Sequence, residues 1–488
     1  SSRRRHTRYQ SLSRGLGDVY KRQGVAAASA AMAGSAAAQG RKADHSKHSV
    51  HGSGRDMSAG PAQKKLPLAP ARGYATPKGN DWYARTVDPD GIYEPGMPGT
   101  DYTPVHKPNG TTVPWKIVDG VKIFHLTASE FMHEFAPGFE AIVWGYNGEM
   151  SGPLIEAVEG DRIRIYVTNK LPVPTSVHWH GLILPCNMDG VSGLTQAPIP
   201  VGETWAYEFP CIQHGTFMYH SHKDTMTQEG MGLFGMFVIH PRQPKRPRPD
   251  RDFSLMLHEM DIKPGTYRPD TSVSSGFNTL TLNGRVFPGT APLVCQTNDR
   301  VRIRIGNLSA MDHHPFHIHG HSFQITETDG GEVPGAALWP ETSALVAVGQ
   351  ARNLEFVSDN PGDWAVHCHM THHTMNQMGH GLANMVGVKA DPVDDAVQGL
   401  IPSYMTMGQD GMGEMGKHAK YMDLPENSIP MVGAKGPHGY ISMGGMFTVL
   451  KVRNRVQGFD DPGWYQPPEG TMVRAATNAE LRRDGIKV

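Results

Sequence analysis

The feature that most constrains the fold of this 488-residue chain is an internal duplication. Three motifs of the first half recur in the second: PLIEAVEGDRIRIYVTN (153–169) as PLVCQTNDRVRIRIGN (292–307), HWHG (178–181) as HIHG (317–320), and GTFMYHSH (215–222) as GDWAVHCH (362–369). The runs are short, rich in β-branched residues and separated by turn residues, which is typical of strands in a sandwich. Repetition on this scale predicts two copies of one β-sandwich.

Composition agrees with a turn-rich, all-β protein, because the chain has 56 Gly and 38 Pro and only 19% charged residues. We predict two tandem Greek-key sandwiches, at residues 118–245 and 250–391. Residues 39–117 are polar and are expected to form a flexible arm. Residues 392–488, with eight Met between positions 405 and 446, are expected to wrap over the second sandwich as an extension.

The first 38 residues are not expected to belong to either sandwich. Residues 1–23 resemble a translated sequencing adapter, and we interpret them as an artefact that replaces the true start. Residues 24–38 resemble the apolar and cleavage regions of a secretory signal, with a cut after Ala38. We therefore expect an exported protein, periplasmic or extracellular. The net charge of −1 indicates no nucleic-acid partner, and no apolar run is long enough to span a membrane.

Four cysteines in this length do not make a disulfide scaffold. Cys368 is a candidate metal ligand and is set aside from disulfide pairing. The other three leave two alternatives open: one disulfide, with Cys186–Cys211 as the favoured pair, or three free and buried thiols that include Cys295.

The run His367-Cys368-His369 can serve two metal sites at once. In a strand, alternate side chains point to opposite faces, so His367 and His369 face one way and Cys368 faces the other. A covalent path then joins a thiolate to two imidazoles. Such wiring suits the transfer of single electrons from one copper to a cluster.

The thiolate side fits a blue copper site, in which two His and one Cys lie in a plane and a Met binds weakly along the axis. His373 and Met378 follow Cys368 by five and ten positions, and His314 completes the set. The doublets at 313–314 and 372–373 leave the register open by one residue. We choose the second member of each doublet by spacing.

The imidazole side has many candidate ligands, because the chain contains four His-X-His pairs. They are His178/His180, His220/His222, His317/His319 and His367/His369. Each pair on an extended segment presents two imidazoles to one face. Eight histidines suit a cluster of three coppers that holds O₂ and delivers four electrons to it.

The motifs HWHG, HSH, HPFHIHGH and HCHMTHHTMNQM resemble those of the multicopper oxidases, the laccase family, over about residues 120–390. The resemblance implies cupredoxin-like sandwiches and four coppers. By motif position it implies these ligands: type 2, His178 and His317; type 3, His180, His220, His222, His319, His367 and His369; type 1, His314, Cys368, His373 and Met378. It also implies that the carboxylate of Asp189 assists proton delivery, a role we favour over that of a turn residue, although Asp-Gly is a standard turn signal.

Some positions depart from the commoner family pattern. Gln377 stands where Gly usually precedes the axial ligand, and Thr374 stands where some relatives have an acidic residue. Ser221 occupies the thiolate position of the first copy, so only the second sandwich is expected to hold type 1 copper. This layout resembles the two-domain small bacterial laccases, which implies a homotrimer with each cluster shared between neighbouring subunits.

The implied reaction is the oxidation of four one-electron donors coupled to reduction of O₂ to water. The donor is either a phenol or aromatic amine, or Cu(I), which a methionine platform such as Met412 and Met415 would favour. The same methionines suit a flexible core filler equally well. Two other functions remain open: a copper nitrite reductase, which would need type 1 ligands in the first sandwich, and a copper-sequestering protein without turnover.

Overall fold

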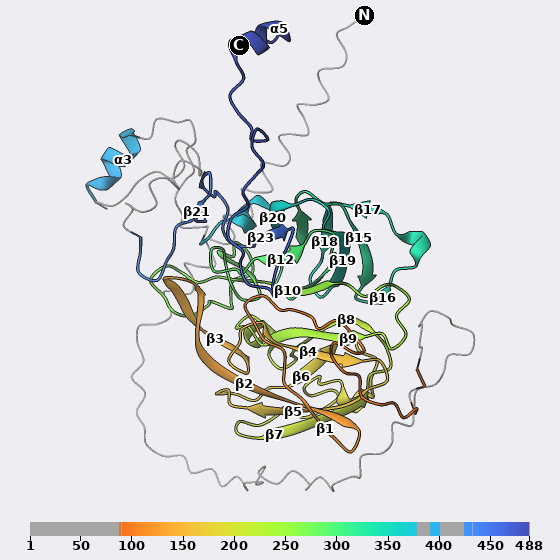
Figure 1. The fold of residues 1–488 in the computed structure, drawn as a ribbon. Coiled ribbons are helices and arrows are strands. Elements are labelled where there is room, and N and C mark those ends of the chain that lie inside the picture. The colour runs from red at the N-terminus through yellow and green to blue at the C-terminus, as the bar shows by residue number, and fades with distance from the viewer. Residues whose placement is uncertain (1–86, 89, 378–390, 401–423, 432, 488) are drawn as a thin grey trace, which may run out of the picture. The chain divides into compact units, whose positions relative to one another are not determined.

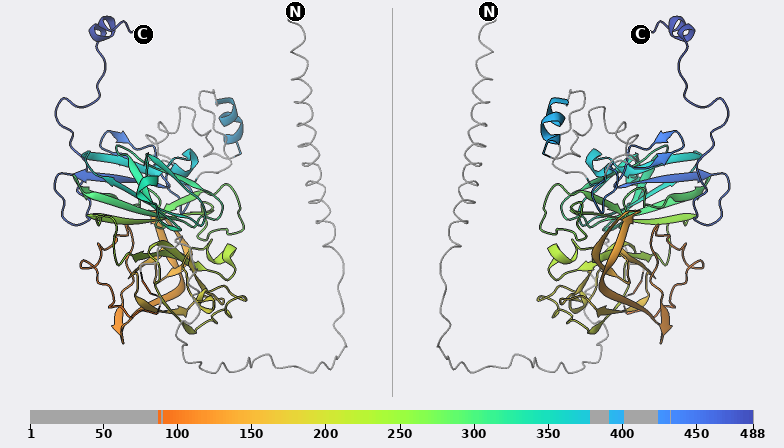
Figure 2. Two further views of the ribbon diagram at one scale, coloured as in Figure 1. Left: turned by 90° about the vertical axis from the view of Figure 1, so that its right-hand side faces the viewer. Right: turned by 90° about the vertical axis from the view of Figure 1, so that its left-hand side faces the viewer.

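The computed structural model describes residues 87–88, 90–377, 391–400, 424–431 and 433–487. Within these ranges the chain forms two β-sandwiches stacked on one another, as views from different sides show (Figures 1 and 2). The predicted all-β fold with two tandem sandwiches is confirmed. The helices of the described ranges are short, and none has the length and apolar character needed to cross a bilayer.

The first sandwich consists of one sheet of order β1-β2-β5-β7, with β3 also paired to β2, and a second of order β4-β9-β8-β6. Its strands are β1 (Lys116–Val118), β2 (Val121–Ala136), β3 (Phe139–Tyr146), β4 (Gly152–Val158), β5 (Arg162–Asn169), β6 (Val177–His180), β7 (Thr204–Pro210), β8 (Gly215–Ser221) and β9 (Phe234–His240). The period of two is clear in β5, where Ile163, Ile165 and Val167 are buried and the residues between them are partly exposed. Trp179 of β6 is fully buried among aromatic rings of this core.

The second sandwich repeats the plan with a sheet of order β11-β10-β13-β19-β15-β16, to which β17 adds on β15, and a sheet of order β12-β23-β20-β14-β18. Its strands are β10 (Arg251–Met260), β11 (Thr279–Leu282), β12 (Leu293–Gln296), β13 (Arg300–Asn307), β14 (His314–Ile318), β15 (Phe323–Thr328), β16 (Gly331–Glu332), β17 (Pro340–Glu341), β18 (Ser343–Val346), β19 (Ala351–Val357), β20 (Gly362–Cys368) and β23 (Phe447–Arg453). The remaining elements are η1 (Cys186–Met188), α2 (Thr225–Gln228), η2 (Gly335–Ala337), η3 (Thr371–Thr374), α3 (Asp391–Gln398), β21 (Lys435–Gly436), β22 (Gly439–Tyr440) and α5 (Asn478–Arg483).

The second sandwich extends beyond the boundary predicted at residue 391. Strand β23 lies between β12 and β20 in the middle of the sheet, with Phe447 opposite His367. The apolar run of β23 indicates a strand in the sequence, but its partners lie far away in the chain. We therefore correct the expectation that residues 392–488 only wrap over the sandwich, because they supply one of its core strands.

The arm predicted at 39–117 is also shorter than expected, as far as the structure describes it. The described part of this segment contacts both sandwiches through its backbone: Val105 N donates to Glu156 Oε1 of β4, and His106 N donates to Asp252 O of β10. The ammonium group of Lys107 is buried and donates to the carbonyl oxygen of Gly152. Buried hydrogen bonds of this kind hold the segment in place.

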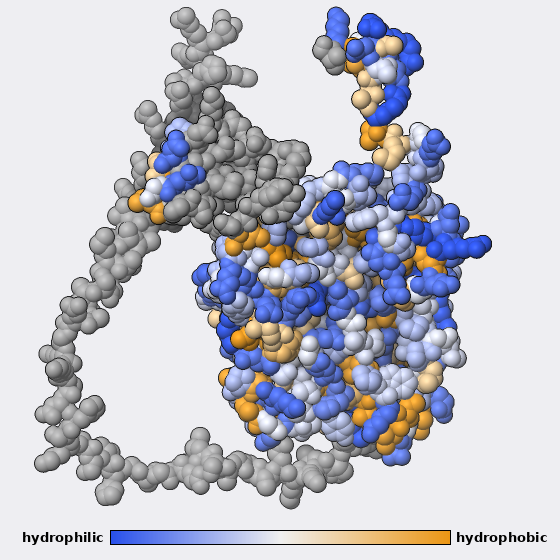
Figure 3. Space-filling view, turned by 60° about the vertical axis from the view of Figure 1, so that its left-hand side comes forward, coloured by the Kyte–Doolittle hydropathy of each residue, from blue (hydrophilic) through white to orange (hydrophobic). Residues whose placement is uncertain are grey.

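The two sandwiches share a third apolar cluster that contains Phe135 and Phe139 of the first and Met256 and Met260 of the second. A buried ion pair lies at the same interface. Arg304 of β13, only 1% exposed, donates to both carboxylate oxygens of Asp252 at 2.8 and 2.9 Å and to Thr216 Oγ1 of the first sandwich. On the described surface seen in Figure 3, apolar residues form several small patches between polar ones.

All four cysteines are free thiols, so the Cys186–Cys211 disulfide is not formed. Cys186 is exposed, whereas Cys211 and Cys295 are buried. The free-thiol alternative is therefore correct, except that one of the three thiols is not buried.

Candidate metal centres

Three buried side chains of the second sandwich bring their donor atoms together in a small triangle. His314 begins β14, Cys368 ends β20, and His373 lies in η3 just after it. The sides of the triangle are 3.0 Å (His314 Nδ1 to His373 Nδ1), 3.5 Å (Cys368 Sγ to His373 Nδ1) and 3.6 Å (Cys368 Sγ to His314 Nδ1). The point equidistant from the three atoms lies about 2.0 Å from each of them, which is close to an ordinary metal–ligand bond length.

The second member of each histidine doublet faces the thiol, as the spacing predicts, and polar neighbours fix both rings from outside. Ser309 Oγ lies 2.7 Å from His314 Nε2. Asp312 Oδ2 lies 3.4 Å from His373 Nε2. Because each Nε2 has an oxygen partner, each ring can keep its Nδ1 lone pair for a metal ion.

Burial keeps this triangle in a neutral state until a cation arrives. Burial, followed by the neighbouring His373, lowers the pKa of His314 to about 3. Burial raises the pKa of the Cys368 thiol to about 12. The imidazoles therefore stay available as ligands, and ionisation of the thiol requires a bound positive charge.

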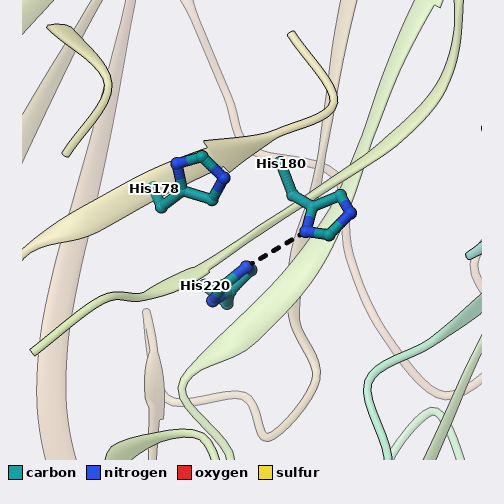
Figure 4. Close-up of side chains that lie close together, drawn as sticks. All are labelled: His178, His180 and His220. Carbon is teal, nitrogen blue, oxygen red and sulfur yellow. Dashed lines mark hydrogen bonds between the residues drawn. The ribbon is translucent and has the colours of Figure 1, made fainter. Parts of the chain in front are cut away.

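Four histidines of the first sandwich form a separate group, which we call the first quartet: His178, His180, His220 and His222. Strands β6 and β8 pair with His178 opposite His220, so the two His-X-His motifs face each other. His180 Nδ1 lies 3.3 Å from His220 Nε2, the contact drawn in Figure 4, and His178 lies beside both rings. The donor atoms of these three lie within 4.8 Å of one another.

Backbone carbonyls fix the protonation of two rings of the first quartet. His178 Nδ1 donates to Asp189 O at 2.7 Å, and His220 Nδ1 donates to Ser221 O at 3.0 Å. A carbonyl oxygen only accepts, so both rings carry their proton on Nδ1 and leave Nε2 for a metal. Glu229 Oε1 lies 2.9 Å from His220 Nδ1; burial opposes protonation, but this carboxylate raises the pKa of His220 overall.

The second sandwich repeats this arrangement in a second quartet: His317, His319, His367 and His369. Strands β14 and β20 pair with His317 opposite His367. His317 Nδ1 donates to Thr342 O, and His367 Nδ1 donates to the carbonyl of the next residue, Cys368. The tautomers of His317 and His367 therefore match those of His178 and His220.

Strand β20 connects the second quartet to the buried triangle. His367 Nε2 lies 3.1 Å from His319 Nε2, while the adjacent Cys368 Sγ faces His314 and His373. The alternation of a strand thus places neighbouring residues in two different ligand groups.

The two quartets do not meet within one chain. They lie on different sheets, and among the described residues no ring contact joins them. The sheet that carries the second quartet is the one farther from the first sandwich, because β8 contacts β13, β15 and β19 of the other sheet. The first quartet instead faces the loop before β19, where Gly349 approaches the ring of His180.

Three further predicted residues have different outcomes. Met378 lies outside the described residues. Asp189 lies beside the first quartet, with its Oδ1 3.4 Å from His178 Nδ1. Ser221, at the thiolate position of the first sandwich, is buried and donates to Gln228 Oε1 at 2.6 Å.

Carboxylates around the triangle were missed by the sequence reasoning. Glu259 Oε1 accepts hydrogen bonds from the backbone of Met311 (2.6 Å) and Asp312 (3.0 Å). Burial raises the pKa of Glu259 to about 8, the two backbone donors oppose this, and the charge of Asp312 adds to it. The position of Asp312 directly before the 313–314 doublet was a usable signal. Glu259 offered none, since it comes close only through the pairing of β10.

Comparisons with known proteins agree with this geometry. Residues 128–244 and 259–387 each match a family model described as multicopper oxidase. Copper resistance protein A of Pseudomonas syringae pv. tomato is 44% identical over 111 residues, which cover 23% of this chain and 18% of that protein. Laccase-1 of Botryotinia fuckeliana is 34% identical over 234 residues, which cover 45% of this chain and 40% of that protein. The chain thus spans less than half the length of either relative.

Among solved structures, the blue copper oxidase from Nitrosomonas europaea has a similar fold, with a TM-score of 0.50 and 22% identity over 75% of this chain and 94% of that chain. The duplicated sandwiches, the buried Cys–His triangle and the two family matches lead to one assignment: the chain belongs to the multicopper oxidase family.

Proposed function

We propose that this protein takes single electrons from a reducing donor at a type 1 copper and uses four of them to reduce O₂ to water at a trinuclear copper cluster. Strand β20 carries the proposal, because His367 belongs to the second quartet and contacts His319, while the adjacent Cys368 contacts His314 and His373. Copper bound by these residues would supply reversible one-electron chemistry. The peptide between Cys368 and His367 is then a short covalent path between the two sites.

The chain's own residues have defined roles in this scheme. Under the proposal, His314, Cys368, His373 and Met378 hold the type 1 copper, and the eight quartet histidines hold the cluster. The carbonyl acceptors of His178, His220, His317 and His367 fix the tautomers that leave Nε2 for the metal. Asp189, which lies next to His178, is the residue we assign to proton delivery, since the conversion of one O₂ to two waters takes up four protons as well as four electrons.

We extend the proposal to a homotrimer in which each cluster lies between two copies. Each quartet supplies four imidazoles, half of what the proposed three-copper cluster takes, and the two quartets are separate within a chain. In a closed ring, the first quartet of one copy can meet the second quartet of its neighbour, which is a head-to-tail interface.

Complementation between two inactive variants tests this arrangement. One variant carries His178→Ala and His220→Ala, and the other carries His317→Ala and His367→Ala. In trimers assembled at random from equal amounts, about one quarter of the interfaces combine two intact quartets. We expect co-expression to restore about that share of O₂ uptake. No recovery in mixed trimers would rule out a cluster shared between copies.

Copper content and colour test the reaction centre itself. The loaded protein is expected to bind about four coppers per chain and to show the intense absorption of a copper–thiolate bond. A colourless protein with one copper would refute the proposal. A coloured, loaded protein that consumes no O₂ with any donor would instead be a copper-sequestering protein.

The competing nitrite reductase function has less support. It requires a thiolate in the first sandwich, where Ser221 is hydrogen-bonded to Gln228. Among the residues that the structure describes, the one Cys–His triangle lies in the second sandwich. Reduction of nitrite at a rate comparable to that of O₂ would reverse this preference.

We also propose export to the periplasm or the extracellular space. The proposal rests on the apolar and small residues at 24–38, which lie outside the described residues. The chain is expressed with a complete signal sequence, and N-terminal sequencing of the secreted protein is expected to find cleavage after Ala38. Retention of the uncleaved chain in the cytoplasm would contradict it.

A further inference from the structure

A pocket of about 470 Å³, which we call the linker pocket, lies where the segment between β9 and β10 crosses the second sandwich. This connecting segment contributes Arg246 and Pro247 to the lining. The sandwich contributes residues of β13, β15 and β19, together with Pro340 of β17. The volume is within the range of ordinary small-molecule sites. No candidate copper ligand belongs to the lining, so the linker pocket is separate from the proposed reaction centre.

A row of three arginines on β13 leads from the buried interface to this pocket. Arg300, Arg302 and Arg304 alternate along the strand, so their side chains point to the same face of the sheet. Arg304 contacts the first sandwich and is 2% exposed, Arg302 is 11% exposed, and Arg300 is 40% exposed. The first sandwich thus covers one end of the row, and the linker pocket lies at the other end, where Arg300 lines it.

The charges of the lining favour an anion. The carboxylate of Glu355 is balanced by Arg302, whose Nη2 lies 2.6 Å from Oε1. Arg300 Nη1 lies 3.9 Å from Glu355 Oε2, which is too far for a hydrogen bond. Arg246 donates to the carbonyl oxygen of Val333 at 2.7 Å, and no carboxylate of the described residues forms an ion pair with it. Two guanidinium groups therefore line the pocket without a counter-ion of their own, and they attract negative charge.

The remaining lining is a mixture of apolar surface and neutral polar groups. Pro247, Pro340 and Val357 supply apolar atoms, and Ser322 and Gln324 supply a hydroxyl and an amide. A guanidinium binds a carboxylate with two parallel hydrogen bonds, so arginines suit this group especially well. An inorganic anion would leave the apolar surface without a partner, and a neutral phenol would leave the guanidinium groups without one. The lining therefore fits a carboxylate attached to an apolar body.

We propose that the linker pocket binds an organic acid with a compact apolar body, whose carboxylate is held by Arg246 and Arg300. The ligand then contacts the segment that joins the sandwiches and the second sandwich itself. A molecule that binds the folded chain in this way stabilises it in proportion to its occupancy. The inference goes beyond the proposed oxidase reaction and does not depend on it, because the pocket and the candidate copper ligands share no residue.

Calorimetric titration of the copper-loaded protein with benzoate tests the proposal. Benzamide has nearly the same shape without the charge, and inorganic phosphate has charge without the apolar body. The pocket variants are Arg246→Gln and Arg300→Gln, which remove one charge each. Arg248→Gln is the matched control, because it removes the same charge from the same connecting segment, and Arg248 lies outside the lining. The melting temperature of each variant without ligand shows whether it is folded.

We expect the Kd for benzoate to rise about ten-fold in each pocket variant, since each loses a charged hydrogen bond, and to stay unchanged in Arg248→Gln. Benzamide and phosphate are expected to bind the parent protein at least about ten-fold more weakly than benzoate. Absence of benzoate binding, or the same Kd in all four proteins, would overturn the inference, because the second result places the binding elsewhere, for example at copper. An equal loss in Arg248→Gln would overturn it too, since the charge of the whole segment would then explain the binding. Phosphate that binds as tightly as benzoate would refute the apolar body.

Discussion

Replacing Arg304 with Met is expected to cost about 3 kcal/mol of folding free energy, because it leaves a buried carboxylate without its main partner. Arg304 and Asp252 are each 1% exposed, and two hydrogen bonds of 2.8 and 2.9 Å join them. Loss of one member of such a pair costs about 3–5 kcal/mol. The lower end applies here, since Arg302 Nη1 still lies 3.6 Å from Asp252 and Thr216 keeps its bond to Asn353.

Arg300 provides the matched control. Its side chain is 40% exposed and lies 3.9 Å from Glu355, so Arg300→Met is expected to cost less than about 1 kcal/mol. Urea unfolding followed by tryptophan fluorescence, with copper removed from all samples, measures the difference. A loss of about 3 kcal/mol corresponds to a fall of roughly 10 °C in the melting temperature of a domain of about 150–250 residues.

A double variant isolates the cause. Adding Asp252→Asn to Arg304→Met removes the unpaired charge, and at least half of the lost stability is expected to return. The reasoning would be refuted if Arg304→Met cost no more than Arg300→Met, or if neutralising Asp252 restored nothing.

Three further predictions concern the site and its surroundings. Cys368→Ser is expected to abolish the copper–thiolate absorption and donor oxidation while about three coppers remain bound, which metal analysis and optical spectra would test; a retained blue band would contradict it. Asp189→Asn is expected to lower turnover by about ten-fold without loss of copper, as steady-state O₂ uptake alongside copper analysis can check; a fall in copper content would point to a structural role instead. Burial alone would lower the pKa of His214, but hydrogen bonds to Glu159 and Glu332 raise it to about 9, so its stabilisation is present below pH 6.5 and is lost as the pH rises through 9. Between pH 6.5 and pH 9 the free energy of unfolding falls in the parent protein, and His214→Gln is expected to make this fall smaller by on the order of 2 kcal/mol. An unchanged dependence of the unfolding free energy on pH would disprove the assignment.

The fold and the grouping of the histidines followed closely from sequence because they depend on local alternation. The period of two is visible in the burial of β5, and in β20 the neighbours His367 and Cys368 contact different ligand groups, as strand alternation predicts. The choice of His314 over its neighbour likewise needed only spacing, and the structure places that ring against the thiol.

Features that depend on distant pairing could not be predicted in this way. The run RIRI occurs in both sandwiches, yet Arg164 pairs with Glu208 at the surface while Arg304 is buried at the interface. Nothing local distinguishes the two arginines, since only the stacking of the sandwiches decides which face is covered. For the same reason Glu259 was missed, and the central position of β23 was not foreseen.

The position of β23 changes what the methionine-rich stretch is. The chain departs from the buried triangle just after His373 and comes back to it at Met446, whose N–H donates to His373 O and whose carbonyl accepts from Cys368 N. The methionine-rich stretch is therefore a long connection whose two ends both lie beside candidate copper ligands, and not a free tail. Strand β23 is held in the second sandwich by its own ladders with β12 and β20, so a chain made as two fragments that divide before β23 is a natural candidate for a split enzyme.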